Sequence, residues 1–184
     1  MEGVIGLFFL LLASNVGFSA AADLNVYGEP LAKCDRSDVH DRRYPSTGFM
    51  RTNTCTATSE DAGSHYVCVN LPVDYTSNDQ LYSSFWTKTG QARSAVEATQ
   101  WPLPGPWCIC MWAYASMREQ HPEFQKMLNC PAVNEWVVDS YDERNPSQLA
   151  ALISVCEQCD IVKRASNTNL AEKCRRVLAG AVSS

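Results

Sequence analysis

Alternating apolar and polar residues mark one clear strand, over residues 65–71. The valines at 67 and 69 and Leu71 share one face of an extended segment, because side chains two residues apart point the same way. His65 falls on that apolar face and Cys68 on the other, so His65 is not a natural co-ligand of Cys68 and is interpreted as a hydrogen-bonded structural histidine. Residues 135–141, by residue type, give a second predicted strand.

Apolar positions three and four residues apart predict the helices. A short amphipathic helix fits residues 81–86, and 111–120 turns helical after the extended, proline-rich 101–106, ending before His121-Pro122. From residue 147 the pattern is helical to about residue 165. A second helix starts at a capping box at 169–172 and runs through 178, where Gly180 ends it. These two helices form a predicted C-terminal helical hairpin.

These elements predict an α+β fold: a small single domain of short strands and long loops with one or two helices, supported by disulfides, plus the C-terminal hairpin. The polar run 142–146 closes the main domain. The expected organisation is a signal peptide over 1–22, a cysteine-containing domain over 23–143 and a helical extension over 144–184.

The signal peptide is predicted from a continuous apolar stretch over residues 4–13, which is too short to span a bilayer. Small residues follow it at 19–22, as a cleavage site requires, and Asp23 begins a polar chain. No other apolar stretch in the sequence approaches the length needed to span a bilayer. We therefore expect a secreted protein, or one of the secretory-pathway lumen, with no membrane span.

Composition narrows the partners. In 184 residues, 46% are apolar, which is enough for a core, and fifteen basic residues stand against twenty acidic ones. The mildly acidic, dispersed charge forms no basic stripe, which argues against nucleic acid as a partner. The expected partner is therefore an unknown protein or a small-molecule ligand.

Nine cysteines follow the apolar run, and in an oxidising compartment most should be paired. The disulfide candidates are Cys34, Cys55, Cys68, Cys108, Cys110, Cys130, Cys156, Cys159 and Cys174. Because nine is odd, one thiol is free, metal-bound or bonded to another chain.

Two cysteines stand at the centre of the pattern. Cys108 and Cys110 lie two apart in an extended segment, so both sulfurs are predicted to share a face, while a bond between them would close too small a ring. Both are expected in the core as disulfides, within reach of the cysteines at 34, 55 and 68, with the one left over bonded to Cys130 or free. In the hairpin, Cys174 is expected to bond Cys156 or Cys159.

A metal site is the alternative use of these sulfurs. The candidate ligands are the thiolates of Cys55, Cys68, Cys108 and Cys110, with the imidazole of His65 as a further candidate, and they suit zinc or another transition metal. The disulfide interpretation needs no cofactor. The pair Cys156 and Cys159 has the spacing of a thioredoxin-type motif, but no strand–helix–strand unit precedes it.

Four ordered motifs resemble a mainly bacterial family known as domain of unknown function 2237. They are 25–31 with Cys34, 47–51 with Cys55, 60–68, and 107–110, and the resemblance spans about residues 25–141. This chain departs from the family pattern at Thr54, at Gly105-Pro106 and after Gly90, where the family has a second cysteine, a Gly-Asp-Arg and an Asn-Asp-Leu loop. If those residues form a site in the family, the resemblance implies that this site is degraded here. The resemblance supplies no reaction and no catalytic residues.

Two functions compete. The favoured one is a secreted, disulfide-stabilised binding or structural protein of unknown ligand, because no recognised catalytic constellation appears and an enzyme is not indicated. The alternative is a metal-binding or thiol-redox protein built on Cys108 and Cys110, as suits relatives expected in the cytoplasm. A hydrolase ranks third: Ser64 and His65 are neighbours, but chain adjacency is not triad geometry.

Overall fold

The computed structural model describes residues 23–71 and 81–182, and its fold is α+β as predicted. Its sheet has two antiparallel strands, β1 (Val67–Leu71) and β2 (Gly105–Ile109). In the register, Cys68 lies opposite Cys108 and Val69 opposite Trp107. The predicted signal peptide, 1–22, lies outside the described residues.

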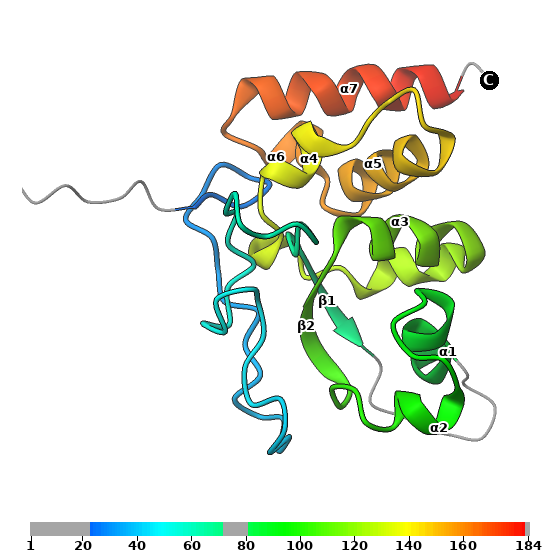
Figure 1. The fold of residues 1–184 in the computed structure, drawn as a ribbon. Helices are drawn as coiled ribbons and strands as arrows, with labels where there is room; N and C mark the ends of the chain where they lie inside the picture. The colour runs from blue at the N-terminus through cyan, green and yellow to red at the C-terminus, as the bar shows by residue number, and fades with distance from the viewer. Residues whose placement is uncertain (1–22, 72–80, 183–184) are drawn as a thin grey trace, which may run out of the picture.

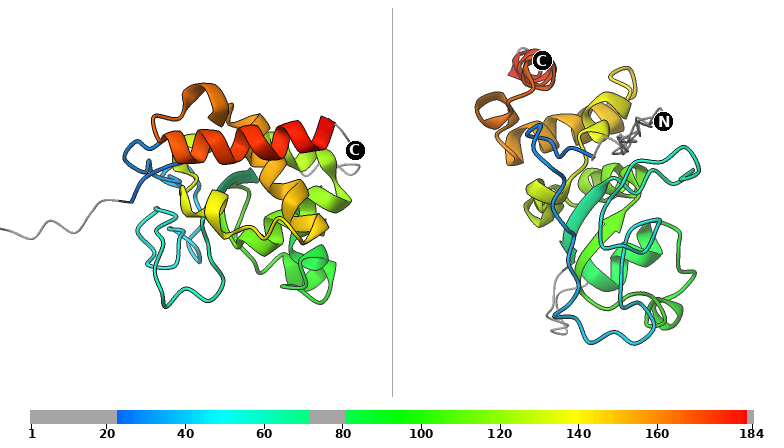
Figure 2. Two further views of the ribbon diagram at one scale, coloured as in Figure 1. Left: turned by 90° about the horizontal axis from the view of Figure 1, so that it is seen from above. Right: turned by 90° about the vertical axis from the view of Figure 1, so that its left-hand side faces the viewer.

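Helices cover one side of this sheet and a long irregular segment, residues 23–66, covers the other (Figure 1). The α-helices are α1 (Leu81–Lys88), α2 (Ala95–Ala98), α3 (Met111–Gln120), α4 (Trp136–Ser140), α5 (Pro146–Gln158), α6 (Ile161–Arg164) and α7 (Thr168–Val182), with 3-10 turns η1 (Pro122–Met127) and η2 (Cys130–Ala132). Helix α5 packs on α3 and α7 packs on α5, so three helices are stacked beyond the sheet (Figures 1 and 2).

The two faces of the sheet bury different chemistry. Val67, Val69 and Leu71 face the main hydrophobic core, as their alternation predicted. Cys68 and Cys108 face the opposite way, into a small separate cluster that also contains Cys34, Cys55 and Ala132. The strands therefore stand between an aliphatic and aromatic core under the helices and a sulfur-rich core under the irregular segment.

The helix predicted over 111–120 is confirmed at both ends, since α3 spans Met111–Gln120. Helix α1 confirms the amphipathic helix, and its Phe85 and Trp86 are buried. The strand predicted over 135–141 is wrong, because this segment forms α4. Val137 and Val138 are adjacent and both fully buried, which a helix face accommodates and an alternating strand does not.

The C-terminal segment is helical as predicted, and its Leu152 and Val177 belong to the main hydrophobic core. The first predicted helix is divided, because Asp160 adopts a left-handed φ of 48° between α5 and α6. The second was predicted to end at Gly180, but α7 continues to Val182. In the described residues, no helix is long and apolar enough to cross a membrane.

Candidate functional site

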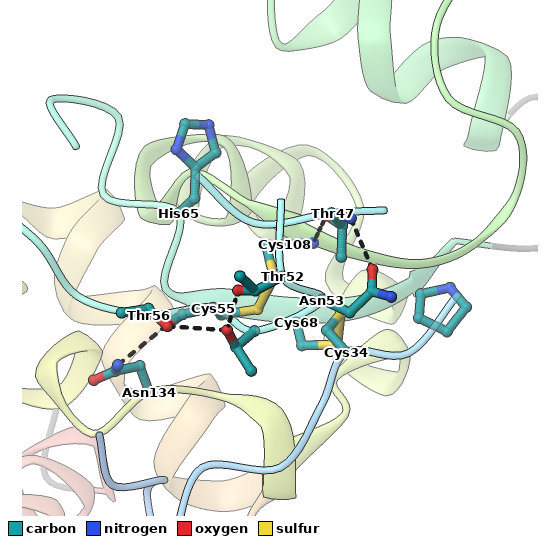
Figure 3. The surroundings of a disulfide bond; sticks show 12 residues. Cys34, Thr47, Thr52, Asn53, Cys55, Thr56, His65, Cys68, Cys108 and Asn134 are labelled. Carbon is teal, nitrogen blue, oxygen red and sulfur yellow. Dashed lines mark hydrogen bonds between the residues drawn. A yellow bond between two sulfur atoms is a disulfide. The ribbon is translucent and has the colours of Figure 1, made fainter. Parts of the chain in front are cut away.

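Eight of the nine cysteines form disulfides. The pairs are Cys34–Cys68, Cys55–Cys108, Cys130–Cys159 and Cys156–Cys174. The first two lie side by side under the irregular segment (Figure 3), where all four residues are at most 1% exposed. The other two bind the C-terminal helices to η2 and to each other. Cys156 and Cys159 bond to different partners and so do not act as a dithiol pair.

Cys110 is the free cysteine, and the prediction that it forms a disulfide beside Cys108 is wrong. Strand β2 ends at Ile109, and Cys110 is the N-cap of α3, with a φ of −58° and a ψ of 139°. The alternation that would have placed both sulfurs on one face stops there. Cys108 bonds Cys55, whereas the sulfur of Cys110 lies elsewhere. Cys130 likewise pairs with Cys159 in the C-terminal half rather than with this group.

The sulfur of Cys110 contacts His65. Its Sγ lies 3.2 Å from Nε2 of His65, and Nδ1 of the same ring lies 2.7 Å from Oδ1 of Asp61. Strand β1 begins at Val67, so His65 lies before it and is not held on the valine face that the sequence predicted. In Figure 3 its ring points away from the disulfide sulfurs. Asp61, His65 and Cys110 thus form a continuous hydrogen-bonded chain.

The loop before β1 positions Asp61 and His65. Asp61 is 4% exposed, and backbone hydrogen bonds hold both of its carboxylate oxygens: Oδ1 accepts from the Gly63 N–H (3.1 Å) and Oδ2 from the His65 N–H (2.7 Å). Oδ1 also contacts the imidazole. The carbonyl of Ser64, a residue with a φ of 49°, accepts from the Met111 N–H at 3.1 Å. This contact joins the loop to the start of α3. The histidine and the cysteine therefore belong to one connected unit.

Gly63 lies beside the contact between His65 and Cys110, where only glycine fits. A Cβ at this position would lie 2.5 Å from Cε1 of His65 and 3.2 Å from Sγ of Cys110. The imidazole and the sulfur occupy the space that any larger residue would fill. The glycine thus allows the loop to pass directly beside the pair.

The electrostatics of the chain favour a charged imidazole. The pKa of His65 is raised to about 9, mainly by its hydrogen bond with Cys110 and secondarily by the Asp61 carboxylate, although burial opposes the shift. At neutral pH both ring nitrogens then carry protons, so Nδ1 donates to Asp61 and Nε2 donates to the sulfur.

A cavity of about 270 Å³ lies beside His65. Its walls include Phe49, Arg51, Trp86, Trp101 and Trp107, contributed by the irregular segment, α1, the segment before β2 and β2 itself. Cys110 itself is not part of the wall, but its sulfur is one hydrogen bond away from a wall residue. A ligand in this cavity would lie next to the imidazole.

The residues considered as metal ligands separate into two groups. Cys55, Cys68 and Cys108 are in disulfides, whereas His65 and Cys110 contact each other. The sulfurs of Cys34, Cys55 and Cys68 lie within 4.8 Å of one another, so they have the proximity of a metal cluster but, as disulfides, not the thiolate charge. A zinc or other transition-metal ion at these sulfurs would require their reduction first.

Asp61 was not considered in the sequence, and His65 was interpreted as structural. Two signals pointed to them. The cysteine count left one sulfur over, and Asp61 precedes His65 by four residues in a loop rich in glycine and serine. Ser64, the neighbour that suggested a hydrolase, is not the partner of His65, whose two ring nitrogens contact Asp61 and Cys110.

Comparison with known proteins places the site within a family. A family model described as an uncharacterised protein conserved in bacteria matches residues 24–134, which includes all three residues of the hydrogen-bonded chain. No curated protein matches the sequence.

Proposed function

Because the chain belongs to this bacterial family, domain of unknown function 2237, which has no assigned activity, we propose a function from the site alone: a thiol-dependent enzyme of the acyl-transfer class with Cys110 as nucleophile. His65 is its acid and base, and Asp61 orients the imidazole. The observation that carries the proposal is the continuous chain from Asp61 through His65 to Cys110. A nucleophile within hydrogen-bond reach of a base that a third group orients is the arrangement such enzymes use.

The reaction follows from the charges. The Cys110 sulfur, as thiolate, adds to the carbonyl carbon of an ester or thioester and forms a new C–S bond. The bond to the leaving oxygen or sulfur breaks with its electron pair, and the imidazolium of His65 gives that atom its Nε2 proton. Neutral His65 then takes a proton from water as the water attacks the acyl-enzyme. This releases the acid and restores the thiolate and the imidazolium.

Helix α3 can assist this step. It has ten residues, and the N–H groups of its first turn have no acceptor within the helix. The Met111 N–H donates to the carbonyl of Ser64. The next two N–H groups, of Trp112 and Ala113, lie in the same first turn after Cys110. Backbone N–H groups at a helix N-terminus stabilise the negative charge of a thiolate or of a tetrahedral oxyanion.

The disulfides support a location for this chemistry. We propose that the protein acts in the secretory route or outside the cell, as the apolar run over 4–13 and the four disulfides together suggest. The second candidate function, a secreted binding or structural protein, is favoured by the burial of all eight bonded cysteines except Cys130, which is half-buried. In that case the His65–Cys110 contact would serve only packing.

Alkylation of Cys110 by iodoacetamide separates these functions, because the other cysteines are bonded and the label is read by mass spectrometry. At about pH 6.5 an unassisted thiol, with a pKa of about 8.5, is only about 1% ionised. We expect rapid labelling of the native protein and a decrease of about ten- to a hundredfold in His65→Gln. His121→Gln, which changes a histidine far from the sulfur in the chain, is the matched control and should label like the native protein.

The same samples test turnover. With an aryl thioester, the native protein should accumulate or turn over an acyl adduct on Cys110, and Cys110→Ser should not. Slow alkylation that is indifferent to His65→Gln, together with no adduct on Cys110, would contradict the enzyme and favour the structural protein.

A further inference from the structure

The cavity beside His65 has a positive character. Its wall contains the guanidinium of Arg51 and the ring of His65, which is protonated at neutral pH, and no carboxylate. Among the residues that the structure describes, no acidic side chain forms an ion pair with Arg51. His65 is paired with the Asp61 carboxylate, so Arg51 is the cation of this wall without an internal counter-ion, and it favours an anionic ligand.

Arg51 is exposed, and its side chain lies at the cavity. Its guanidinium carbon lies 5.6 Å from the centre of the Trp107 ring, within the range of a cation–π contact. The backbone also has a φ of 57°, and its N–H donates to the carbonyl of Gly48 at 3.0 Å. Stacking and a tight turn therefore place this charge above the cavity wall.

The remaining wall is flat and aromatic. Trp86 and Trp101 are stacked, with ring centres 5.0 Å apart and planes 21° from parallel. Trp107 stands nearly perpendicular to Trp86, at 81°. Trp101 is half-buried and Phe49 is 42% exposed, so these two wall residues present aromatic surface to the cavity. A planar apolar group packs on such a surface.

A carboxylate is the anionic group that best fits this cation. It offers two acceptor oxygens, which match the planar N–H groups of a guanidinium.

We infer that this cavity holds the non-reacting part of the substrate, and that this part is a small organic anion with a planar apolar body, such as an aryl carboxylate. The planar group packs against the aromatic wall, and the anionic group meets Arg51. The inference rests on the proposed function, since His65 places the reacting carbonyl between this cavity and Cys110. The ester or thioester to be cleaved is then attached to an aromatic acid.

Benzoate is the simplest probe, and its binding to the full chain can be measured by calorimetry and by quenching of tryptophan fluorescence. We expect benzoate to bind at least about tenfold more tightly than benzyl alcohol, which has the ring without the charge, and than inorganic phosphate, which has the charge without the ring. Equal binding of benzoate and benzyl alcohol, or equal binding of benzoate and phosphate, would overturn the inference.

Two variants locate the contact. Arg51→Gln removes the exposed cation and should weaken benzoate at least about tenfold, whereas Arg175→Gln, an equal charge change on the exposed side of α7, should leave it unchanged. Arg51 is exposed, so Arg51→Gln leaves the buried core intact, and unchanged benzoate binding in that variant refutes the assignment.

The inference and the proposed function fail separately. If His65-dependent alkylation of Cys110 is found but benzoate does not bind, the enzyme stands and the aryl carboxylate is wrong. If benzoate binds through Arg51 but alkylation ignores His65, the pocket stands as a binding site and its assignment to a substrate of Cys110 is overturned.

Discussion

Replacing Asp61 with asparagine tests the whole chain at its buried end. The carboxylate accepts three hydrogen bonds: Oδ1 receives Nδ1 of His65 and the N–H of Gly63, and Oδ2 receives the N–H of His65. Asparagine has the same shape but only one oxygen. With that oxygen at the Oδ1 position, its amide group faces the N–H of His65 and one bond is lost. In the flipped orientation two are lost.

The expected cost follows from that count. A buried donor left without its acceptor destabilises by about 1–3 kcal/mol, so Asp61→Asn should lower the free energy of unfolding by about that amount. Asp61 is 4% exposed, and water cannot easily replace the lost partner. Chemical denaturation, with coincident fluorescence and circular dichroism transitions, gives the value. The control is Asp142→Asn, since Asp142 lies at the surface in an exposed contact with Arg144.

Proton binding gives the second readout. His65 has a raised pKa in the folded protein, so its contribution to stability is fully present below pH 6.5 and is lost as the pH rises through about 9. Removing the Asp61 charge should lower the pKa of His65 while the hydrogen bond with Cys110 keeps part of the shift. The stability of Asp61→Asn should therefore decline less over this range. A His65 titration by NMR that is identical in both proteins, with equal unfolding free energies, would refute the reasoning.

Two further predictions concern the loop and the hairpin. Gly63→Ala should slow alkylation of Cys110 toward the rate of His65→Gln, because the new Cβ would lie 2.5 Å from Cε1 of His65. The control is Gly180→Ala, where the new Cβ would meet no atom of another described element within 4 Å. It should leave alkylation unchanged and stabilise α7 by about 0.5–1 kcal/mol. Normal labelling in Gly63→Ala would mean that the imidazole can move aside. Removing the bond between Cys156 and Cys174 by a double alanine substitution should cost about 3 kcal/mol for a loop of 18 residues, whereas Cys110→Ser, which breaks no disulfide, should cost far less. Equal thermal stability of the two variants would contradict the entropic role of this bond.

The parts of the fold that could be predicted are those whose local pattern agrees with their environment. Helix α3 follows a proline-rich arm and stops before His121-Pro122, and both signals act through the backbone of neighbouring residues. The valine face of β1 is determined by a period of two and by one buried side. Helix α4 could not be predicted, because valine and tryptophan favour strands until the surrounding core requires two adjacent valines on one helical face.

The site depended on a boundary of one residue. The sequence predicted an extended segment that continues through residue 110. In that case the sulfurs of Cys108 and Cys110 would share a face, and both would pair with distant cysteines. The strand ends at Ile109, and Cys110 enters the first turn of α3, so its sulfur meets a loop that precedes β1 by sequence but lies beside α3 in space. Element boundaries are set by tertiary contacts, here the bond from Met111 to the Ser64 carbonyl, and these have no local signature.

A reactive sulfur beside four disulfides requires protection, since a thiolate attacks a disulfide that it can reach. Cys108 precedes Cys110 by only two residues. Its bond to Cys55 nevertheless lies in the small buried cluster, on the side of the sheet away from the main core. Both partners are at most 1% exposed, so in-line attack on either sulfur would require the strands to separate. Hydrogen bonding to His65 further holds the Cys110 sulfur against the loop. The two-stranded sheet thus separates the sulfur proposed as nucleophile from the disulfide sulfurs of the small cluster. This separation allows a nucleophilic cysteine to persist in a protein that also contains four disulfides.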